Sequence, residues 1–373
     1  MFTLFCQAPA ILPDTLKFSN SGYIKVRQNL YEQPVKRVCL RLEKDSAYPA
    51  AVVFGTKIVF LGRDGLEIGR DSFPESKELK VTESVHGEYI YLFGLYGSGT
   101  HGGFHRLYSF DGKVIISKED STTARASNLG IPLENQKAFI RGGLGQVSLT
   151  TFDGKVLSSK QYLNIDNYED GDIYVAATPD ETGFYAIVNR YKIPEDNERP
   201  ILYGYDTKLN ELFRDTLDCP LGFAPQCSEN GKYLGIKEEC ENSSSPFLIF
   251  DPLGRNLISL DNPKTVEFAS GSDYFVYVPR ELGPEIFSSA NVQASYKPAL
   301  PIPEYHWSDA AISSDGSMVT LYNGSEIAQV NTVIRSWSGI DFPYAFEDCR
   351  LYDNGKTLLL RGEFGFVIYN NGR

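Results

Sequence analysis

Short apolar runs separated by turn-forming residues follow one another along this chain of 373 residues. Most runs have the length of a single β-strand, and several alternate apolar with polar residues, as a half-buried strand does. Glycine (33 residues) and proline (20 residues) divide the runs from one another. No long window repeats apolar residues with the 3.6-residue period of a helix. The pattern therefore predicts an all-β protein in which helices are rare or absent.

Two ten-residue stretches carry the clearest copies of a repeated pattern. Ser109–Lys118 reads SFDGKVIISK and Thr151–Lys160 reads TFDGKVLSSK, with seven of ten positions identical at an offset of 42 residues. Each contains an aromatic residue, an Asp-Gly pair and then an apolar run, which is the pattern of a hairpin turn between two strands. The repeat predicts a fold built from successive hairpins.

Weaker copies extend this repeat in both directions. The aspartates that mark the turns are 47, 42, 53 and 45 residues apart, at Asp64, Asp111, Asp153, Asp206 and Asp251. A second turn followed by an apolar strand precedes this mark in most units, in residues 178–188, 228–236, 270–278, 313–322 and 352–360. Each unit of roughly 40–50 residues then holds about four strands, which is the content of a β-propeller blade.

The marks predict a closed β-propeller of eight four-stranded antiparallel blades, with residues 1–373 forming a single domain. Seven blades are the alternative, because the copy at Ile286–Tyr296 is poor. The last unit, Tyr344–Asn370, supplies three strands, and the segment Tyr23–Gln28 supplies the fourth. We expect that segment to pair with Phe366–Asn370, since closure by the termini removes two exposed strand edges.

The copies at residues 109–118 and 151–160 resemble the β-propeller repeat superfamily, with PQQ-like or WD40-like blades whose aromatic-Asp-Gly-Lys-Val turn joins the two outer strands. The chain contains neither a Trp-Asp dipeptide nor a Gly-His pair, so it lacks the signature of true WD40 proteins. It also lacks the Trp-docking motif of PQQ-dependent enzymes. The resemblance implies a fold and not an activity, and we expect no cofactor.

The negative net charge restricts the class of partner that this protein can bind. The formal net charge is −12 and the pI is about 5.0. A field of this sign repels phosphate backbones and anionic lipids, so we expect no nucleic acid partner. No window approaches the roughly 18 apolar residues of a membrane helix, so we expect no membrane insertion.

Cysteine usage and the first residues of the chain suggest a compartment. Residues 1–16 lack basic side chains and their apolar run is interrupted, which is not the pattern of a secretory signal. Six cysteines at irregular spacings, without a C-x-x-C pair, predict free thiols in a reducing environment. They are Cys6, Cys39, Cys219, Cys227, Cys240 and Cys349. We expect a cytoplasmic protein.

No constellation of residues predicts catalysis or a metal site. His101 and His105 lie four residues apart in a glycine-rich stretch, but that spacing aligns two metal ligands only on a helix. The acidic run Asp166–Asp172 departs from a calcium loop because Tyr168 replaces a carboxylate or amide. The repeated turn aspartates are expected to be structural, because a residue needed in every unit serves the turn.

We therefore expect a non-enzymatic scaffold that binds a protein partner through one face, using its longer loops. Gly94–Phe104 and Gln293–His306 are the preferred loops, and the candidate binding residues in or beside them are Tyr96, His101, Phe104, Tyr305 and Trp307. Core packing is the alternative role for Trp307. The alternative function is a propeller hydrolase or lyase, in which carboxylates such as Glu88, Asp172 or Asp273 converge at the central channel.

Overall fold

The computed structural model describes most of the chain, and the contacts within it divide the chain into two compact units. Unit 1 comprises Met1–Val38, Val52–Phe54 and Lys264–Arg373, and unit 2 comprises Cys39–Ala51 and Gly55–Pro263. The described residues are 13–18, 21–41, 48–84, 87–96, 103–120, 130–143, 145–163, 170–191, 199–219, 225–228, 230–238, 245–288, 295–298, 307–341 and 345–371.

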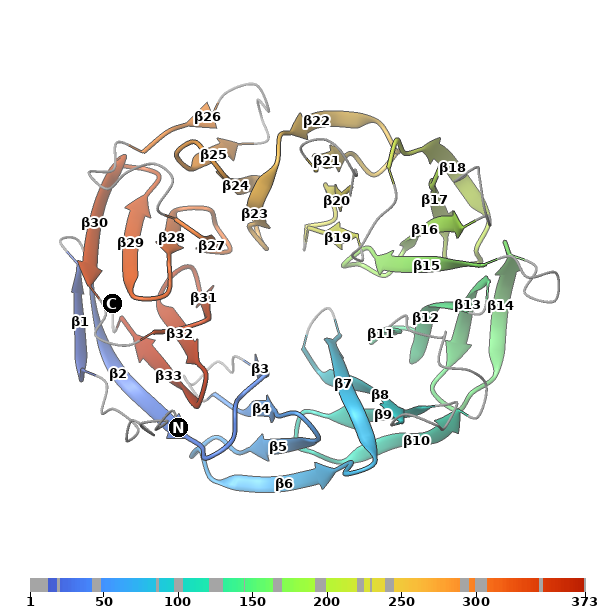
Figure 1. Cartoon of the computed structure of the whole chain (residues 1–373), viewed down its shortest axis with the longest axis horizontal. Helices are drawn as coiled ribbons and strands as arrows, with labels where there is room; N and C mark the ends of the chain where they lie inside the picture. The colour runs from blue at the N-terminus through green and yellow to red at the C-terminus, as the bar shows by residue number, and fades with distance from the viewer. Residues whose placement is uncertain are drawn as a thin grey trace, which may run out of the picture. The chain divides into compact units, whose positions relative to one another are not determined.

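The described residues form eight antiparallel sheets (Figure 1). The first three sheets with four strands are β3 (Arg37–Leu40), β4 (Ala50–Val53), β5 (Lys57–Leu61) and β6 (Glu67–Ser72); β7 (Ser76–Glu83), β8 (Tyr89–Tyr96), β9 (Gly103–Ser109) and β10 (Val114–Asp120); and β11 (Ile131–Leu133), β12 (Ala138–Gly143), β13 (Gln146–Thr151) and β14 (Val156–Gln161). The next two are β15 (Asp170–Ala177), β16 (Gly183–Tyr191), β17 (Ile201–Asp206) and β18 (Glu211–Thr216); and β19 (Gln226–Cys227), β20 (Leu234–Lys237), β21 (Phe247–Phe250) and β22 (Asn256–Leu260). Two more are β23 (Pro263–Phe268), β24 (Tyr274–Pro279), β25 (Glu285–Ser288) and β26 (Ser295–Tyr296); and β27 (Asp309–Ile312), β28 (Met318–Tyr322), β29 (Glu326–Asn331) and β30 (Ser336–Asp341).

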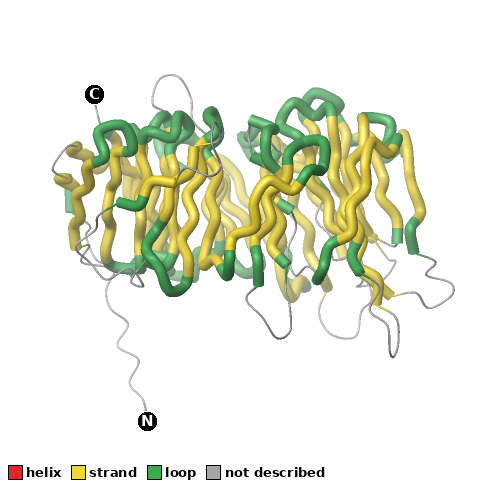
Figure 2. Tube along the Cα trace, turned by 90° about the horizontal axis from the view of Figure 1, so that it is seen from above, coloured by secondary structure: helices red, strands yellow, loops and turns green. Residues whose placement is uncertain are grey.

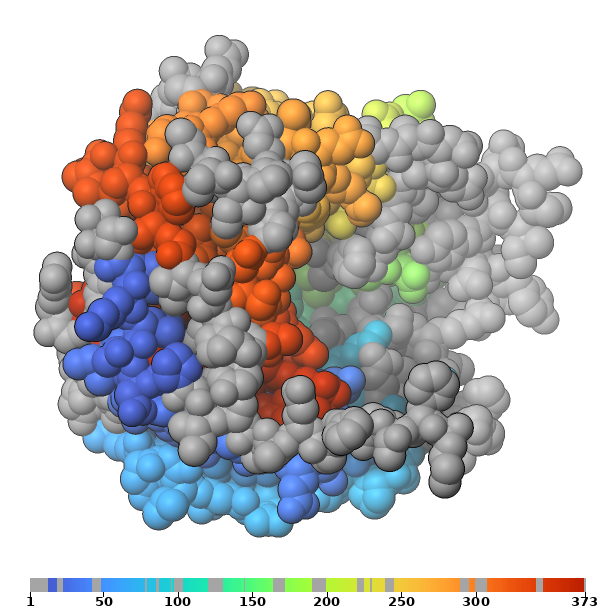
Figure 3. All heavy atoms as spheres, turned by 60° about the vertical axis from the view of Figure 1, so that its left-hand side comes forward, coloured from blue at the N-terminus to red at the C-terminus, as the bar shows by residue number. Residues whose placement is uncertain are grey.

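The eighth sheet combines strands from the two ends of the chain, all within unit 1. Its order is β1-β2-β33-β32-β31, built from β1 (Thr15–Phe18), β2 (Ser21–Leu30), β31 (Asp348–Tyr352), β32 (Thr357–Gly362) and β33 (Gly365–Asn370). Ile24 of β2 pairs with Asn370 of β33, and Gln28 pairs with Val367. Figure 3 shows the blue N-terminal residues against the red C-terminal ones.

The sheets bear on three predictions about the blades. The eight-blade count is confirmed and the seven-blade alternative is wrong, because the poor copy at Ile286–Tyr296 does form β25 and β26. Completion of the terminal blade by Tyr23–Gln28 is confirmed. The expectation that this blade has four strands is corrected, because β1 pairs with the free edge of β2 and adds a fifth strand.

Strand follows strand with little else between them. Figure 2 shows strands and loops, and the described segments contain no helix. Consequently no described helix has the length and apolar character needed to cross a membrane.

Burial falls from the middle strands of a sheet to its last strand. Every residue of β4 is buried, whereas β6 and β14 expose every second residue or more. Between neighbouring sheets, apolar side chains from both faces interdigitate, as where Ile140 and Leu149 share a core cluster with Val175 and Phe184. The short apolar runs of the sequence form strands because side chains on both faces of a sheet pack against its neighbours.

The turn aspartates serve the turns, as predicted, but they occupy two different positions. Asp111 and Asp153 are the third residues of their turns. Their carboxylates accept hydrogen bonds from the hydroxyls of the first residues, Ser109 and Thr151. Asp206 is the first residue of its turn. Its N–H donates to the Asn210 carbonyl, just as the N–H of Thr151, the first residue of the other turn, donates to the Lys155 carbonyl. Hydrogen bonds from the side chains of Ser109, Thr151 and Asn210 lower the pKa of Asp111, Asp153 and Asp206, respectively.

Within unit 2, two buried glutamates connect successive sheets. The Glu134 carboxylate, just after β11, accepts hydrogen bonds from the Ser84 hydroxyl and the Glu88 N–H of the turn between β7 and β8. The Glu181 carboxylate, between β15 and β16, accepts from three successive backbone N–H groups of residues 134–136 at 2.5, 3.0 and 3.3 Å. We call Glu134 and Glu181 the clasp glutamates.

Within unit 1, a tyrosine hydroxyl has the equivalent role. Tyr23 of β2 is only 1% exposed. Its hydroxyl donates to the Gly355 carbonyl of the turn between β31 and β32 at 2.5 Å, and accepts from the Gln329 amide of β29 at 3.0 Å. We call this arrangement the Tyr23 bridge, and it connects three segments that are far apart in the sequence.

Candidate functional site

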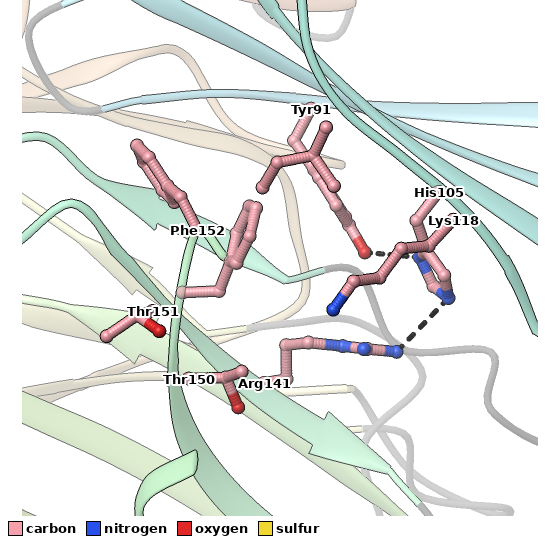
Figure 4. Close-up of a pocket in the computed structure, with 9 residues that line it drawn as sticks. Tyr91, His105, Lys118, Arg141, Thr150, Thr151 and Phe152 are labelled. Atoms are coloured by element: carbon pink, nitrogen blue, oxygen red, sulfur yellow. Dashed lines mark hydrogen bonds between the residues drawn. The ribbon is translucent and has the colours of Figure 1, made fainter. Parts of the chain in front are cut away.

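A small pocket in unit 2 lies between two neighbouring sheets, those of β7–β10 and β11–β14 (Figure 4). The first sheet contributes side chains from β8, β9 and β10, and the second contributes side chains from β12, β13 and the turn that follows. The lining residues are Tyr91, His105, Ile116, Lys118, Phe139, Arg141, Thr150, Thr151 and Phe152. The pocket thus combines three aromatic rings with three nitrogen-bearing side chains.

The aromatic walls form a continuous packed group. The ring of Phe139 lies 5.1 Å from that of Tyr91 and 4.9 Å from that of Phe152, measured between centroids. Tyr91 and Phe139 are buried, and Phe152 is half-buried at the opening. The cavity volume is about 40 Å³, which exceeds the roughly 10–15 Å³ that one water requires. A small apolar group fits this space.

His105 is a fixed part of the pocket. It is 6% exposed, its Nδ1 lies 2.5 Å from the Tyr91 hydroxyl, and its Nε2 lies 3.3 Å from Nη2 of Arg141. Because a guanidinium only donates, Nε2 is assigned as the acceptor and Nδ1 carries the proton. The ring of Phe93 stacks on the imidazole at 4.9 Å. His105 therefore holds one nitrogen of Arg141 and leaves its other donors for a different group.

Lys118 and Arg141 bring two positive charges to the pocket. Figure 4 shows the Lys118 amino group and the Arg141 guanidinium extending toward one another from neighbouring sheets. Lys118 is exposed and Arg141 is half-buried. Within the described part of the chain, neither side chain pairs with a carboxylate, whereas the nearby Arg106 pairs with Glu119 at 3.3 Å. The site can therefore take up a negatively charged group.

The sequence interpretation missed both of these cations. Lys118 ends the first clear repeat copy, so it was visible as a repeated position, and nothing in the sequence distinguished it from its counterpart Lys160. Arg141 carries no sequence signal. His105 was considered only as a metal ligand beside His101, and its actual partners are Tyr91 and Arg141.

Two of the predicted binding residues lie close together in unit 2. Tyr96 ends β8 and is half-buried, and Phe104 of β9 is 1% exposed, with 5.8 Å between their ring centroids. Phe104 stacks on Phe73 at 4.5 Å and occupies the space beside Gly94, where an added Cβ would lie 2.1 Å from the ring. The ends of the predicted loop are therefore strand residues, and Gly94 is required by packing.

Trp307 is also buried, at 1% exposed. It belongs to the apolar cluster between the last two four-stranded sheets of unit 1, together with Val276 and Leu321, and its carbonyl accepts from the Lys264 amino group at 2.6 Å. This burial matches the core-packing alternative. His101 and Tyr305 lie outside the described residues.

A carboxyl group with a displaced pKa occurs in unit 1. Burial of the Glu267 carboxyl group on β23, together with the nearby Asp309 carboxylate, raises its pKa to about 8 against the opposing effect of Arg350. The hydrogen bond from the Thr265 hydroxyl, at 3.4 Å, is long. Glu267 was not among the carboxylates suggested by the sequence. Among the described residues, no group of three or more His, Cys, Asp or Glu side chains is arranged to hold a metal.

The prediction of six free thiols is wrong, because a disulfide at Cys219 takes up two of the six cysteines. Cys219 is disulfide-bonded, whereas Cys39, Cys227 and Cys349 are free. Cys6 and Cys240 lie outside the described residues. Irregular spacing was a poor guide here because a disulfide depends on proximity in the fold and not on separation in the sequence.

No protein-family model and no curated protein sequence matches this chain. Solved structures do resemble it. A eukaryotic initiation factor structure has a TM-score of 0.61 at 13% identity, covering 93% of this chain and 88% of its own. The Dos1 propeller has a TM-score of 0.58 at 9% identity and 94% and 95% coverage. The C-terminal WD40 domain of Sif2 has a TM-score of 0.58 at 11% identity and 93% and 98% coverage. Together with the eight sheets and the shared terminal sheet, this likeness shows that the chain has the β-propeller fold and confirms its resemblance to propeller repeats.

Proposed function

We propose that this protein is a propeller scaffold that binds a protein partner, and that the pocket of unit 2 is part of the binding surface. The observation that supports this is the combination of aromatic walls and an incompletely paired arginine on strands of two packed sheets. Aromatic residues and arginine are the residue types that carry most of the energy at protein interfaces. WD40 propellers, which this fold resembles, are typical of interaction scaffolds.

The net charge of −12 supports a protein rather than a nucleic acid as partner. A cytoplasmic location remains part of the proposal, although the disulfide at Cys219 favours a less reducing environment. Thiol titration of the natively expressed protein in denaturant, without reductant, tests this point. Six free thiols, with the disulfide at Cys219 reduced, support the cytoplasmic proposal, and a lower count contradicts it.

The test of the scaffold proposal is affinity purification of the full chain, compared with a variant whose pocket is closed. In the double variant Thr150→Tyr, Val156→Glu, the tyrosine ring fills the pocket and the glutamate places a carboxylate near the pocket's positive charges. We expect a partner of reproducible stoichiometry that loses at least about thirtyfold in affinity, equivalent to about 2 kcal/mol, when the pocket is closed. A partner that binds both proteins equally excludes the pocket as the contact, and the absence of any stoichiometric partner overturns the scaffold proposal.

The displaced pKa of Glu267 favours one second candidate, a hydrolase or lyase in which this protonated carboxyl donates a proton. A carboxyl group held neutral near pH 7 beside a second carboxylate is the arrangement that acid catalysis uses. The measurement is a broad hydrolase and lyase screen of the wild type beside Glu267→Gln. Turnover that disappears in the variant, with a melting temperature no lower than that of the wild type, would support the enzyme and replace the scaffold proposal.

A further inference from the structure

Unit 2 contains two neighbouring junctions between sheets that are built from the same repeat, and they differ at one place. Lys118 and Lys160 occupy equivalent positions, since each ends a copy of the ten-residue repeat and each lies on the last strand of its sheet. The sheets that face these lysines, β11–β14 and β15–β18, are aligned by their turns. The N–H of Thr151 donates to the Lys155 carbonyl, and the N–H of Asp206 donates to the Asn210 carbonyl, so Thr151 is equivalent to Asp206. The two junctions can therefore be compared residue by residue.

At the second junction, the protein itself occupies and neutralises the lysine site. The Lys160 amino group lies 5.1 Å from the centroid of the Tyr205 ring and 3.4 Å from a carboxylate oxygen of Glu211. Tyr205 and Glu211 are cross-strand partners on β17 and β18. An apolar ring and a carboxylate from one strand pair thus fill the space beside Lys160.

At the first junction, both of these groups are missing. The turn alignment places Thr150 at the position of Tyr205 and Val156 at the position of Glu211, and Thr150 and Val156 are likewise cross-strand partners. The smaller Thr150 leaves the cavity of about 40 Å³, and Val156 is 58% exposed. Among the described residues, Lys118 consequently has no counterpart of the Tyr205 ring and no paired carboxylate, and Arg141 adds a second positive charge.

We propose that this pocket binds an acidic peptide segment of the partner, in which a small apolar side chain enters the cavity and an adjacent carboxylate pairs with Lys118 and Arg141. The occupant supplies from outside what Tyr205 and Glu211 supply at the next junction. Arginine can hold a carboxylate through two parallel hydrogen bonds, and Arg141 uses only Nη2 for its contact with His105. This inference rests on the proposed scaffold function and adds the chemistry of the partner.

The probe is a fluorescein-labelled eight-residue peptide with a central Glu-Val-Asp, compared with a Gln-Val-Asn peptide of the same length. Fluorescence anisotropy with the full chain measures both at about 50 mM and about 300 mM salt, where screening differs strongly. We expect the acidic peptide to bind at least tenfold more tightly at the lower salt, with a smaller advantage at the higher salt. Thr150→Tyr combined with Val156→Glu should abolish binding of the acidic peptide.

The matched variants are Lys118→Gln and Lys160→Gln, which remove the same charge at equivalent repeat positions. Lys118→Gln should remove most of the preference for the acidic peptide, and Lys160→Gln should leave it unchanged, because Lys160 is already paired with Glu211. Lys118 is exposed, so its substitution does not threaten folding. Equal binding of the two peptides, or equal effects of the two lysine variants, overturns the inference. If the affinity-purified partner still depends on the pocket in that case, the scaffold proposal stands and only the acidic occupant is wrong.

Discussion

The two units connect their sheets by different chemistry. In unit 2, the clasp glutamates receive backbone N–H groups from a neighbouring turn, three of them at Glu181. In unit 1, a neutral hydroxyl forms the Tyr23 bridge, and the half-buried Glu267 has a single long hydrogen bond from Thr265. A buried carboxyl group with few hydrogen-bond donors, such as that of Glu267, is held in its neutral form.

The difference shows that a glutamate in this fold cannot be interpreted from its residue type. Glu181 and Glu267 both lie at sheet junctions, but one fixes three backbone groups of its neighbour and the other has its pKa raised to about 8 by burial. Stability in unit 2 therefore depends on the acceptor oxygens of Glu181, whereas in unit 1 the burial of Glu267 favours its neutral form. The predictions below test this contrast.

Removing residues 1–30 should have the largest effect, because it removes both β1 and β2 from the terminal sheet of unit 1. The deletion takes away the buried side chains of Leu16, Phe18 and Tyr23, each worth roughly 1.5–3 kcal/mol, and exposes the edge of β33. We expect a melting temperature lower by at least about 10 °C, or a loss of soluble protein. Deleting only residues 1–12, which precede β1, is the control. Equal stability of the two proteins would show that β2 does not hold the terminal sheet.

Glu181→Ala should have the next largest effect. It leaves three backbone N–H groups of residues 134–136 without their acceptor, which predicts a loss of about 3 kcal/mol in the free energy of unfolding. Glu181 also has a φ of 57°, a conformation in which an alanine is strained and a glycine is not. Glu181→Gly should therefore lose about 1 kcal/mol less than Glu181→Ala in chemical denaturation. A loss below about 1 kcal/mol in both variants would contradict the clasp.

Tyr23→Phe should cost less, because it keeps the buried ring and its edge contact with Phe18. The substitution leaves the Gly355 carbonyl and the Gln329 amide without the hydroxyl, which predicts a loss of about 1–2 kcal/mol. The control is Tyr369→Phe, because the Tyr369 ring is also buried and its hydroxyl donates to a single carbonyl, that of Pro13, at 2.9 Å. If both variants lose the same small amount, the Tyr23 bridge has no special role.

Substituting Glu267 should cost the least stability, because its effect is a change in how stability depends on pH. Its folded pKa of about 8 lies above its ordinary value of 4.5, so the folded state binds the extra proton. Below about pH 4.5 both states are protonated and no penalty applies, and stability falls as pH rises from there to about 8. The slope cannot exceed about 1.4 kcal/mol per pH unit. Glu267→Gln should remove this slope. Chemical denaturation of both proteins at pH 5 and at pH 8 measures it. An identical slope in the variant would assign the pH dependence to other groups.

The sequence by itself determined the class of fold and most of its turns. The repeat at residues 109–118 and 151–160 predicted hairpins, and the spacing of the turn marks predicted eight blades and the pairing of Tyr23–Gln28 with the last strand. These features are local or periodic, so they depend on residues that are close in sequence or repeated at a fixed distance. The sequence also established that the repeated aspartates are structural, although it aligned Asp206 two positions away from its structural equivalent.

Only the tertiary structure decided which side chains meet between sheets. The pocket joins Lys118 to Arg141, the clasp joins Glu181 to residues 134–136, and the bridge joins Tyr23 to Gln329. Each of these contacts forms between residues on different sheets, which meet only when the sheets pack against one another. Thr150 in place of Tyr205 opens a cavity that no pattern in the sequence marks, because the consequence appears only when the neighbouring sheet supplies Lys118. A repeat therefore specifies the frame, and the exceptions to it specify the sites.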